Sequence, residues 1–373
     1  MTTIEAAGGA VPDAFLRLPY ELYRGTPAWS PRPPDATVHL LDPARNPYWK
    51  QAERELFMVV ENGDVAGRIV AVYDPEYCRQ HHSNTGFFGF FECRNDAVLA
   101  RALVVAAARW LAARGCRRMI GPFHPMPDAY DLGLLVEGFA LPQNSGEPFN
   151  FPFYQELFAA CGLRKLVDLS AFHHAFADNP VWEKMMARLH KHLQLHTAVR
   201  VRPFDPAHGT RDTEILRAIL NDVYAGEPLF SCVSATLLQC VLQTYARPED
   251  MRFFLIAEVH GEPAGMNLLA PDYDEALRAA AATPATPPAH TTTRNIHGIR
   301  TGEFCIAPRF RHTAAAAALF HASWEMAVRE GFQWAELSFQ QEDNTAICRM
   351  LEAFGAVRAK RFRIYEGDVT TGV

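Results

Sequence analysis

An internal repeat constrains the fold of this chain more than any other feature of its sequence. Residues 101–123 and 317–339 share one pattern, an amphipathic helix that ends at a glycine and is followed at once by a strand. Gly115 in the first segment corresponds to Gly331 in the second, at an offset of 216 residues and without a gap. We therefore expect two units of the same architecture within one chain.

A second pair of matching segments precedes the two helices. Residues 57–72 and 254–269 each contain two apolar runs joined by a turn, Asn-Gly at 62–63 and His-Gly at 260–261. Such turns are typical of β-hairpins. Downstream, each copy continues with a short helix led by an asparagine and then with a final strand. The sequence thus predicts the order hairpin, strand, helix, strand, helix, strand twice, which is an α/β fold.

The repeat and the local composition together predict the domain organisation. Proline and aromatic residues are frequent in the first 50 positions, as in a packed extended arm, and a later stretch rich in proline, threonine and alanine indicates a flexible loop. The predicted segments are an arm at 1–50, an N-terminal domain at 51–177, a linker helix at 178–198 and a C-terminal domain at 199–368, with the flexible loop at 276–295 inside it.

Composition excludes several classes of protein. Hydrophobic residues make up 49% of the chain and charged residues 21%, which is typical of a globular protein with a large core. The 36 Lys and Arg residues against 42 Asp and Glu residues give a net charge of -6 without a basic stripe, so nucleic acid is not expected as a partner. The sequence shows neither a membrane-spanning apolar stretch nor a secretory signal, and we expect a cytoplasmic protein.

Cysteine and histidine spacing gives no indication of a metal centre. The eight cysteines are scattered and contain no Cys-x-x-Cys pair, so reduced structural thiols are expected. The pairs His81-His82 and His173-His174 have neither a carboxylate nor a cysteine at ligand spacing, which favours solvated histidines over metal ligands or a catalytic base. We therefore expect no metal site.

The order of elements and one loop of the second copy together resemble the GNAT acyltransferase superfamily. The run from Ile306 to Ala316, IAPRFRHTAAA, resembles the end of the superfamily's central strand and its (Arg/Gln)-x-x-Gly-x-(Gly/Ala) loop. In such a loop, backbone N–H groups at a helix N-terminus hold the pyrophosphate of coenzyme A. The resemblance implies donor-binding residues at Cys305, Ile306, Arg311, His312, Thr313, Ala314, Ala315, Ala316 and Asn344.

Two departures from the superfamily pattern concern this second copy. Ala314 stands where the loop motif has glycine, and its Cβ narrows the approach of a phosphate. Leu351 stands where the superfamily usually places a tyrosine that acts as general acid. In the first copy the phosphate motif is replaced by Arg94-Asn95-Asp96, and the carboxylates of Asp96 and Glu92 would repel a pyrophosphate.

Motifs of the first copy resemble a bacterial family of GNAT-like proteins that includes the bacterial ceramide synthases. These motifs are Gly67-Arg68-Ile69, Gly86-Phe87-Phe88-Gly89-Phe90-Phe91-Glu92, Gly121-Pro122 and Asn150-x-Pro152-x-Tyr154. The resemblance implies an α/β fold of tandem GNAT-like domains, each a mixed, mostly antiparallel sheet flanked by helices. It also implies transfer of an acyl group from a thioester to an amine. The phenylalanines at 87–91 are open to two interpretations, the lining of an acyl tunnel or a buried core strand.

Each candidate catalytic residue has a structural alternative. Glu303 is a candidate base for the amine proton or a solvated residue at a strand end. Glu92 is its counterpart in the first copy or a favourable charge at a helix N-terminus. Tyr154 is a candidate acid or a core tyrosine with a satisfied hydroxyl. Cys305 is more consistent with a small core residue than with a nucleophile, and Asn344 with a helix cap than with a substrate contact.

We therefore hypothesise an acyl-CoA-dependent N-acyltransferase that acts on a primary amine, with a long-chain amino-alcohol as the favoured acceptor. Acyl-CoA would be a co-substrate, and no permanently bound cofactor is expected. Acyl carrier protein is an alternative donor, because it could dock on the basic segment 184–202. Peripheral membrane contact is left open. The alternative function is a catalytically degenerate GNAT-like pair that binds a ligand or a partner.

Overall fold

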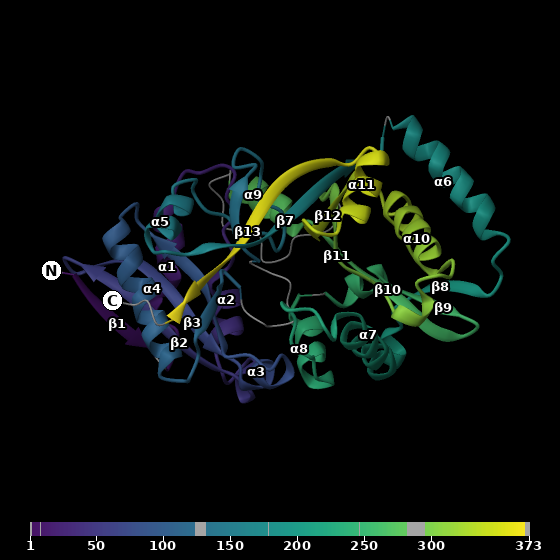
Figure 1. Ribbon diagram of the computed structural model, residues 1–373. Helices are drawn as coiled ribbons and strands as arrows, with labels where there is room; N and C mark the ends of the chain where they lie inside the picture. The colour runs from purple at the N-terminus through teal and green to yellow at the C-terminus, as the bar shows by residue number, and fades with distance from the viewer. Residues whose placement is uncertain are drawn as a thin grey trace. The chain divides into compact units, whose positions relative to one another are not determined.

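The computed structural model describes residues 2–7, 9–123, 132–177, 179–245, 247–281 and 295–369. They form two compact units, each with its own strands and helices (Figure 1). The first unit comprises Met1–Leu169 and Lys360–Val373, and the second comprises Ser170–Ala359. The chain passes from the first unit into the second within strand β7 (Arg164–Ala175) and returns within strand β13 (Val357–Asp368).

The first unit is built on a mixed sheet with strand order β1-β2-β3-β4-β5-β13, in which β6 also pairs with β13. Only β4 and β5 run parallel among the pairings described within this unit. Its further elements are β1 Thr2–Ala7, α1 Asp13–Leu22, α2 Pro34–Leu41, β2 Glu53–Glu61, β3 Asp64–Tyr73, α3 Pro75–Gln80, β4 Thr85–Cys93, α4 Ala97–Ala112, β5 Arg118–Gly121, β6 Leu134–Glu137 and α5 Tyr154–Ala160, with a 3-10 turn at Pro47–Lys50.

Local sequence explains the hairpin and the long helix of the first unit. Asn62 and Gly63 adopt φ values of 54° and 93°, as the tight turn between β2 and β3 requires, so the predicted hairpin is confirmed. The Asp96 carboxylate caps α4, and Leu99 and Leu103 are among the residues that this helix buries against the sheet. The predicted glycine at its end, Gly115, has φ 81°.

The second unit repeats this plan with strand order β7-β12-β11-β10-β9-β8. Strands β11 and β12 are its parallel central pair. Its elements are α6 Pro180–Leu193, β8 Val199–Pro203, α7 Gly209–Tyr224, α8 Ala235–Tyr245, β9 Phe254–Val259, β10 Glu262–Pro271, α9 Tyr273–Ala281, β11 Gly298–Ile306, α10 Ala315–Arg329, β12 Trp334–Gln341 and α11 Thr345–Ala353, with 3-10 turns at Pro206–His208, Pro248–Phe253 and Pro308–Phe310.

The same sequence signals shape the second unit. His260 and Gly261 form the turn between β9 and β10, with φ values of 52° and 83°, which confirms the second predicted hairpin. Helix α10 buries Leu319 and Met326 in a core that also contains Phe332. The predicted order of hairpin, strand, helix, strand, helix and strand is therefore present in both repeats.

The last strand of each repeat completes the sheet of the other unit. Strand β7 ends the first repeat but pairs with β12 in the second unit. Strand β13 ends the second repeat but runs antiparallel to β5 in the first unit, where Tyr365 faces Gly121. The sequence ranges predicted for the domains describe the repeats, whereas each compact unit also includes part of the strand that ends the other repeat.

Of three further predicted segments, two differ in the structure. The arm at 1–50 is not simply extended, because it contains β1, α1 and α2, and its Phe15 and Tyr23 are buried. The linker helix is α6. The flexible loop predicted at 276–295 begins inside α9, which extends to Ala281, and residues 282–294 lie outside the described residues.

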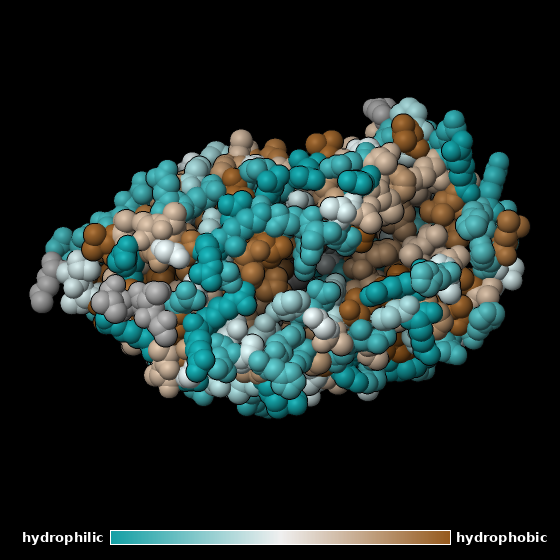
Figure 2. All heavy atoms as spheres, viewed as in Figure 1, coloured by the Kyte–Doolittle hydropathy of each residue, from teal (hydrophilic) through white to brown (hydrophobic). Residues whose placement is uncertain are grey.

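Most residues on the face drawn in Figure 2 are hydrophilic, and the hydrophobic ones form separate patches. Within the described parts of the chain, the helices are all too short or too polar to traverse a lipid bilayer.

Candidate functional site

In the second unit, the central strands separate next to a predicted catalytic residue. The parallel ladder of β11 and β12 runs from the Gly298–Trp334 pair to the Thr301–Leu337 pair, and Glu303 follows two residues later. The pairing of β11 with β10 shifts register at the same place, which indicates a β-bulge. Glu303 therefore lies just beyond the parallel ladder and next to the bulge.

Glu303 is half-buried and is not the solvated strand-end residue that its alternative interpretation required. Its Oε2 accepts a hydrogen bond of 2.9 Å from the hydroxyl of Tyr224, at the end of α7. The Sγ of Cys305 lies 3.8 Å from the same carboxylate oxygen and 3.6 Å from the tyrosine hydroxyl. Glu303, Tyr224 and Cys305 therefore form one polar cluster inside the second unit.

Burial sets the protonation behaviour of this cluster. Desolvation raises the pKa of Glu303, and the hydrogen bond from Tyr224 opposes that rise. The nearby charge of Glu303, together with burial, raises the pKa of Tyr224 well above its usual value. Desolvation also raises the pKa of Cys305 well above its usual value. A thiol in such surroundings stays protonated, which supports the core interpretation of this cysteine.

The predicted donor loop leads into α10. Arg311, His312 and Thr313 are exposed, and Ala315 is buried at the start of the helix. Thr313 Oγ1 accepts a hydrogen bond of 3.2 Å from the backbone N–H of Ala315. Among the described residues, no carboxylate caps this helix, so its N-terminal N–H groups face no competing negative charge.

Helix α4 of the first unit has the opposite character. The carboxylate of Asp96 accepts hydrogen bonds from the backbone N–H groups of Val98, at 2.7 Å, and Leu99, at 3.3 Å. A carboxylate already occupies the place that a phosphate would take. The structure therefore distinguishes the two repeats as possible sites for an anionic donor.

Asn344 and Leu351 lie on α11. Asn344 is at the N-cap position, but its side chain makes no capping hydrogen bond and is exposed, so the expected capping role was wrong. Leu351 is buried in a small apolar cluster with Phe172. Since leucine has no ionisable group, this position supplies no general acid.

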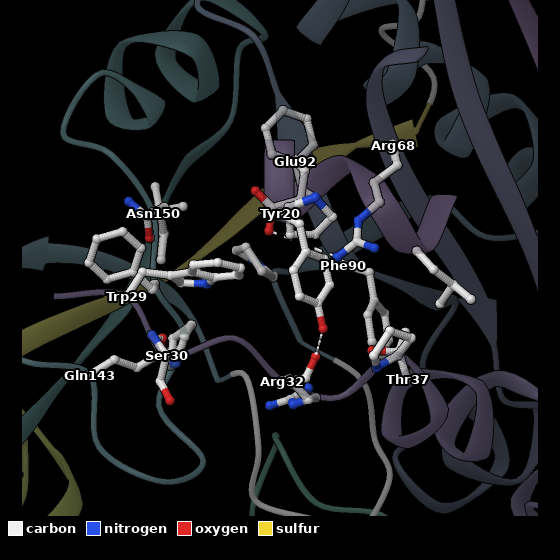
Figure 3. A pocket seen from close by; sticks show the side chains of 18 of the residues that line it. Tyr20, Trp29, Ser30, Arg32, Thr37, Arg68, Phe90, Glu92, Gln143 and Asn150 are labelled. Carbon is white, nitrogen blue, oxygen red and sulfur yellow. Dashed lines mark hydrogen bonds and ion pairs between the residues drawn. The ribbon is translucent and has the colours of Figure 1, made fainter. Parts of the chain in front are cut away.

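The first unit contains a cavity of about 110 Å³ (Figure 3). Strand β4, helix α1 and the segment around Gln143–Asn150 line it, so residues from distant parts of the sequence enclose one space. Figure 3 shows Arg68 and Glu92 near Tyr20, whose ring centroid lies 5.3 Å from that of Trp29. The residues at its wall are Leu16, Pro19, Tyr20, Trp29, Ser30, Arg32, Pro34, Thr37, Arg68, Phe90, Phe91, Glu92, Pro122, Gly133, Leu134, Gln143, Pro148, Phe149 and Asn150.

Glu92 is the most constrained charged residue at this cavity. Its Oε2 accepts hydrogen bonds from the hydroxyls of Tyr23, at 2.5 Å, and Tyr154, at 2.8 Å. Its Oε1 lies 3.9 Å from the guanidinium of Arg68. Asp96, not Glu92, occupies the helix N-terminus, so that alternative for Glu92 was wrong.

Tyr154 is fully buried in the core of the first unit. Its hydroxyl donates to Glu92 and accepts the backbone N–H of Cys93 at 3.1 Å. Burial, with the charge of Glu92, raises the pKa of Tyr154 well above its usual value. The arrangement matches a core tyrosine with a satisfied hydroxyl and gives Tyr154 no open path to a leaving group.

The phenylalanines of β4 are mostly buried, as the core interpretation predicts, and two of them also reach the cavity. Phe87 and Phe88 are completely buried, whereas Phe90 and Phe91 line the cavity. Phe90 has a φ of 52°, at the point where β4 changes register against β3. That distortion turns the strand's end towards the cavity.

Three side chains that contact Glu303 or Glu92 were not predicted from the sequence. Tyr224 follows no motif and comes close to Glu303 only through the packing of α7. Tyr23 belongs to the aromatic arm, and its hydroxyl reaches Glu92, 69 residues later, only through the fold of the chain. Arg68 lies in the motif Gly67-Arg68-Ile69, and an arginine inside an apolar hairpin strand could have indicated a buried partner.

The paired histidines also differ from expectation. His174 is only 1% exposed, so the prediction of a solvated residue was wrong for it. Its ring packs against that of Trp182, with centroids 3.9 Å apart and the ring planes tilted by 46°. His173, its neighbour on β7, is exposed as expected.

Two curated proteins resemble this chain along nearly its whole length. Protein YghO of Escherichia coli (strain K12) is 26% identical, with 95% of this chain and 92% of that protein covered. The bacterial ceramide synthase of Caulobacter vibrioides (strain NA1000 / CB15N) is 25% identical, with 94% and 93% covered. No family model matches the sequence.

Solved structures show the same architecture. A tandem GNAT protein from the clavulanic acid biosynthesis pathway aligns with a TM-score of 0.59 at 14% identity, covering 98% of this chain and 99% of that one. A GCN5-related N-acetyltransferase from Sphaerobacter thermophilus aligns with a TM-score of 0.54 at 13% identity, with 98% and 96% covered. The predicted fold class, tandem GNAT-like domains with mixed sheets flanked by helices, is confirmed.

Proposed function

We propose that this chain, which has the tandem GNAT fold and resembles a bacterial ceramide synthase in sequence, is an acyl thioester-dependent N-acyltransferase. The observation that carries the proposal is the Glu303–Tyr224 pair, located beyond the end of the β11–β12 ladder and in the same unit as helix α10, which has no carboxylate cap among the described residues. The acceptor would be a primary amine, with a long-chain amino-alcohol as the favoured class.

The donor would bind at the start of α10. Backbone N–H groups at 314–316 and the exposed guanidinium of Arg311 would hold the pyrophosphate of acyl-CoA, and His312 and Thr313 would flank it. The donor set suits an anion, because the helix dipole and the guanidinium both favour negative charge. The methyl groups of Ala314 and Ala316 make the approach tighter than glycine would. Asn344 would lie towards the donor, not in a capping role.

Glu303 would act as the base. The amine nitrogen attacks the thioester carbon and gives its proton to the Glu303 carboxylate, directly or through water. The backbone N–H groups of Cys305 and Ile306 would stabilise the negative oxygen of the tetrahedral intermediate. A carboxylate with a raised pKa is a stronger base than an ordinary glutamate, so burial suits Glu303 to this step.

Tyr224 would complete the transfer of the proton. When the carbon–sulfur bond breaks, the tyrosine hydroxyl protonates the thiolate and regains a proton from Glu303 through their hydrogen bond. The products are an amide and a free thiol, and both residues return to their starting states. Tyr224 would thereby replace the acid that is missing at Leu351.

The cavity of the first unit supports a second candidate function for that unit, the binding of a ligand without chemistry. Its volume is somewhat smaller than the roughly 150 Å³ of a cavity that holds benzene, so it suits a small group and not a long chain. Glu92 and Tyr154 would act there only if this cavity received the reacting thioester. The Asp96 cap makes the first unit a poor site for CoA.

Matched Glu→Gln variants test the assignment. Thiol release and amide formation are followed by mass spectrometry, with mixed acyl-CoAs and long-chain amines as substrates. We expect E303Q to lower kcat by about 10²–10⁴-fold and E92Q to leave it within about tenfold. CoA should still raise the Tm of E303Q, which separates lost chemistry from lost donor binding. Loss of turnover in E92Q alone would assign the reaction to the first unit and overturn the proposal.

The nature of the donor needs its own comparison. Acyl-CoA and acyl carrier protein carrying the same acyl group are supplied at equal concentration. Higher kcat/KM with acyl-CoA supports the α10 loop as the donor site, because a carrier protein presents no pyrophosphate. Turnover with the carrier protein alone would instead support docking on the basic segment 184–202.

A further inference from the structure

Three side chains that metal ions prefer meet between helices α6 and α10 of the second unit. His190 lies in the last turn of α6, and His321 and Glu325 lie one turn apart on α10. The two helices pack against each other. The potential ligand atoms of all three side chains lie within 4.8 Å of one another.

The geometry is already close to that of a zinc site. His321 Nδ1 lies 3.3 Å from Glu325 Oε2. Bonds of about 2.0–2.1 Å in a tetrahedral site place neighbouring N and O ligands roughly 3.4 Å apart, so this pair needs no rearrangement. The rings of His190 and His321 have centroids 5.2 Å apart, and because all the ligand atoms lie within 4.8 Å of one another, His190 has to move by at most roughly 1.4 Å to reach ligand spacing.

The burial pattern allows that shift. His321 is only 5% exposed and is fixed in the helix interface, whereas His190 and Glu325 are exposed side chains with freedom to adjust. One ring nitrogen of His190, Nε2, lies 3.2 Å from the side-chain amide of Gln194. Metal-binding histidines usually hold their second ring nitrogen in such a contact.

We propose that His190, His321 and Glu325 bind a divalent transition-metal ion, with Zn²⁺ as the preferred ion, and that water fills the fourth position. Two imidazoles and one carboxylate are a donor set that favours zinc over magnesium or calcium, which require oxygen ligands. The ion would fasten the last turn of α6 to α10. This site is separate from Glu303 and from the proposed donor loop, so it does not depend on the proposed function.

Zinc titration of full-length, tag-free protein tests the proposal after treatment with a chelator. Calorimetry should show one Zn²⁺ bound per chain, and E325Q and H321A should each weaken the affinity about tenfold or more. Because E325Q changes an exposed side chain, it tests the site even if H321A does not fold. Co²⁺ bound in place of zinc should give the visible absorption of tetrahedral coordination in the wild type and lose it in E325Q.

A neighbouring histidine pair provides the matched control. His192 and His196 have their Nε2 atoms 3.1 Å apart near the same end of α6, and together they could attract zinc without the proposed ligands. We expect H192A to keep the wild-type affinity and the zinc-dependent rise in Tm. Loss of binding in H192A with full binding in E325Q would overturn the proposal, as would absence of binding at 100-fold molar excess of Zn²⁺.

Discussion

The hydroxyl of Tyr224 donates a hydrogen bond of 2.9 Å to Glu303, a residue 79 positions later in the chain. The bond joins the end of α7 to the central strand β11. It has two effects, because it orients the carboxylate and also favours its charged form against the desolvation that raises its pKa. Tyr224 therefore influences the pH at which Glu303 becomes able to accept a proton.

The Y224F variant should shift the pH dependence of activity. Loss of the hydrogen bond removes an interaction that lowers the pKa of Glu303, so the pKa rises further. Since Glu303 must be deprotonated to act as a base, kcat/KM increases with pH through that pKa, and its acidic limb should move up by roughly 0.5–1 pH unit.

The control for Y224F is Y273F, which removes another tyrosine–carboxylate hydrogen bond, that of Tyr273 with Asp250, in the same unit. In Y273F the acidic limb of the plot of kcat/KM against pH should stay at its wild-type position. If the acidic limb of kcat/KM also stays unchanged in Y224F, Glu303 is not the group that controls the rate.

Reversal of charge at Arg311 should abolish donor binding. The R311E variant places a carboxylate where the proposed pyrophosphate would bind, and coenzyme A should no longer raise the Tm of the protein. Arg329, at the other end of α10, is the matched control, because R329E makes the same change of charge on the same helix. An equal Tm shift in R311E and the wild type would remove the α10 loop from the donor site.

Acid should destabilise the second unit through His174. Burial and the neighbouring charge of His173 lower the pKa of His174 from 6.5 to about 4. The unfolded chain therefore binds the proton more tightly, and stability that is complete above pH 6.5 is lost as pH falls towards 4. The cost is about 2 kcal/mol at pH 5.

Urea unfolding at pH 7.5 and pH 5 measures this effect. In H174L the difference between the two pH values should shrink by roughly 2 kcal/mol, whereas H173L, which changes the exposed neighbour, should retain most of it. An unchanged difference in H174L would mean that other groups dominate the acid response.

The buried ion pair of Glu147 and Lys360 should be important for the stability of the first unit. The two side chains are 1% and 4% exposed, and the lysine also donates to the carbonyl of Pro142. In K360M the carboxylate remains buried without its cation, at a cost of about 3–5 kcal/mol. The segment that follows Pro142 lines the cavity, so the pair also supports the cavity wall.

A double-mutant cycle checks this expectation. The E147Q/K360M protein should be less destabilised than the sum of its single variants by at least about 1 kcal/mol. The exposed pair of Arg45 and Asp35 is the control, and R45M should leave the urea midpoint close to that of the wild type. If the losses of stability in E147Q and K360M simply add in the double variant, Glu147 and Lys360 do not interact directly.

Local signals explain how much of the fold the sequence predicted. Turn residues such as Asn62-Gly63 and helix ends such as Gly115 act through their own backbone conformation, so their pattern is sufficient. The exchange of β7 and β13 is different. Each segment has the composition of a strand, but alternation of side chains does not specify which neighbour a strand joins.

The site was predictable only where one segment supplies it. Glu303 and the loop after it lie in a single stretch that resembles a known motif. Tyr224 and the cluster of His190 with His321 depend on the packing of helices far apart in the chain, and no local spacing reports such contacts. The N-cap position of Asn344 was correctly placed, but its side-chain conformation depends on its surroundings.

The exchange of β7 and β13 has a consequence for how such a chain could arise and be divided. If the gene were cut between the repeats, each fragment would carry a strand belonging to its partner and leave β5 or β12 as an unpaired sheet edge. Neither half would then be an autonomous folding unit, whereas the two halves expressed together could reassemble by complementation. Fusion of the subunits of a strand-swapped homodimer would produce the same connectivity, so gene duplication would have preserved an ancestral dimer inside one polypeptide.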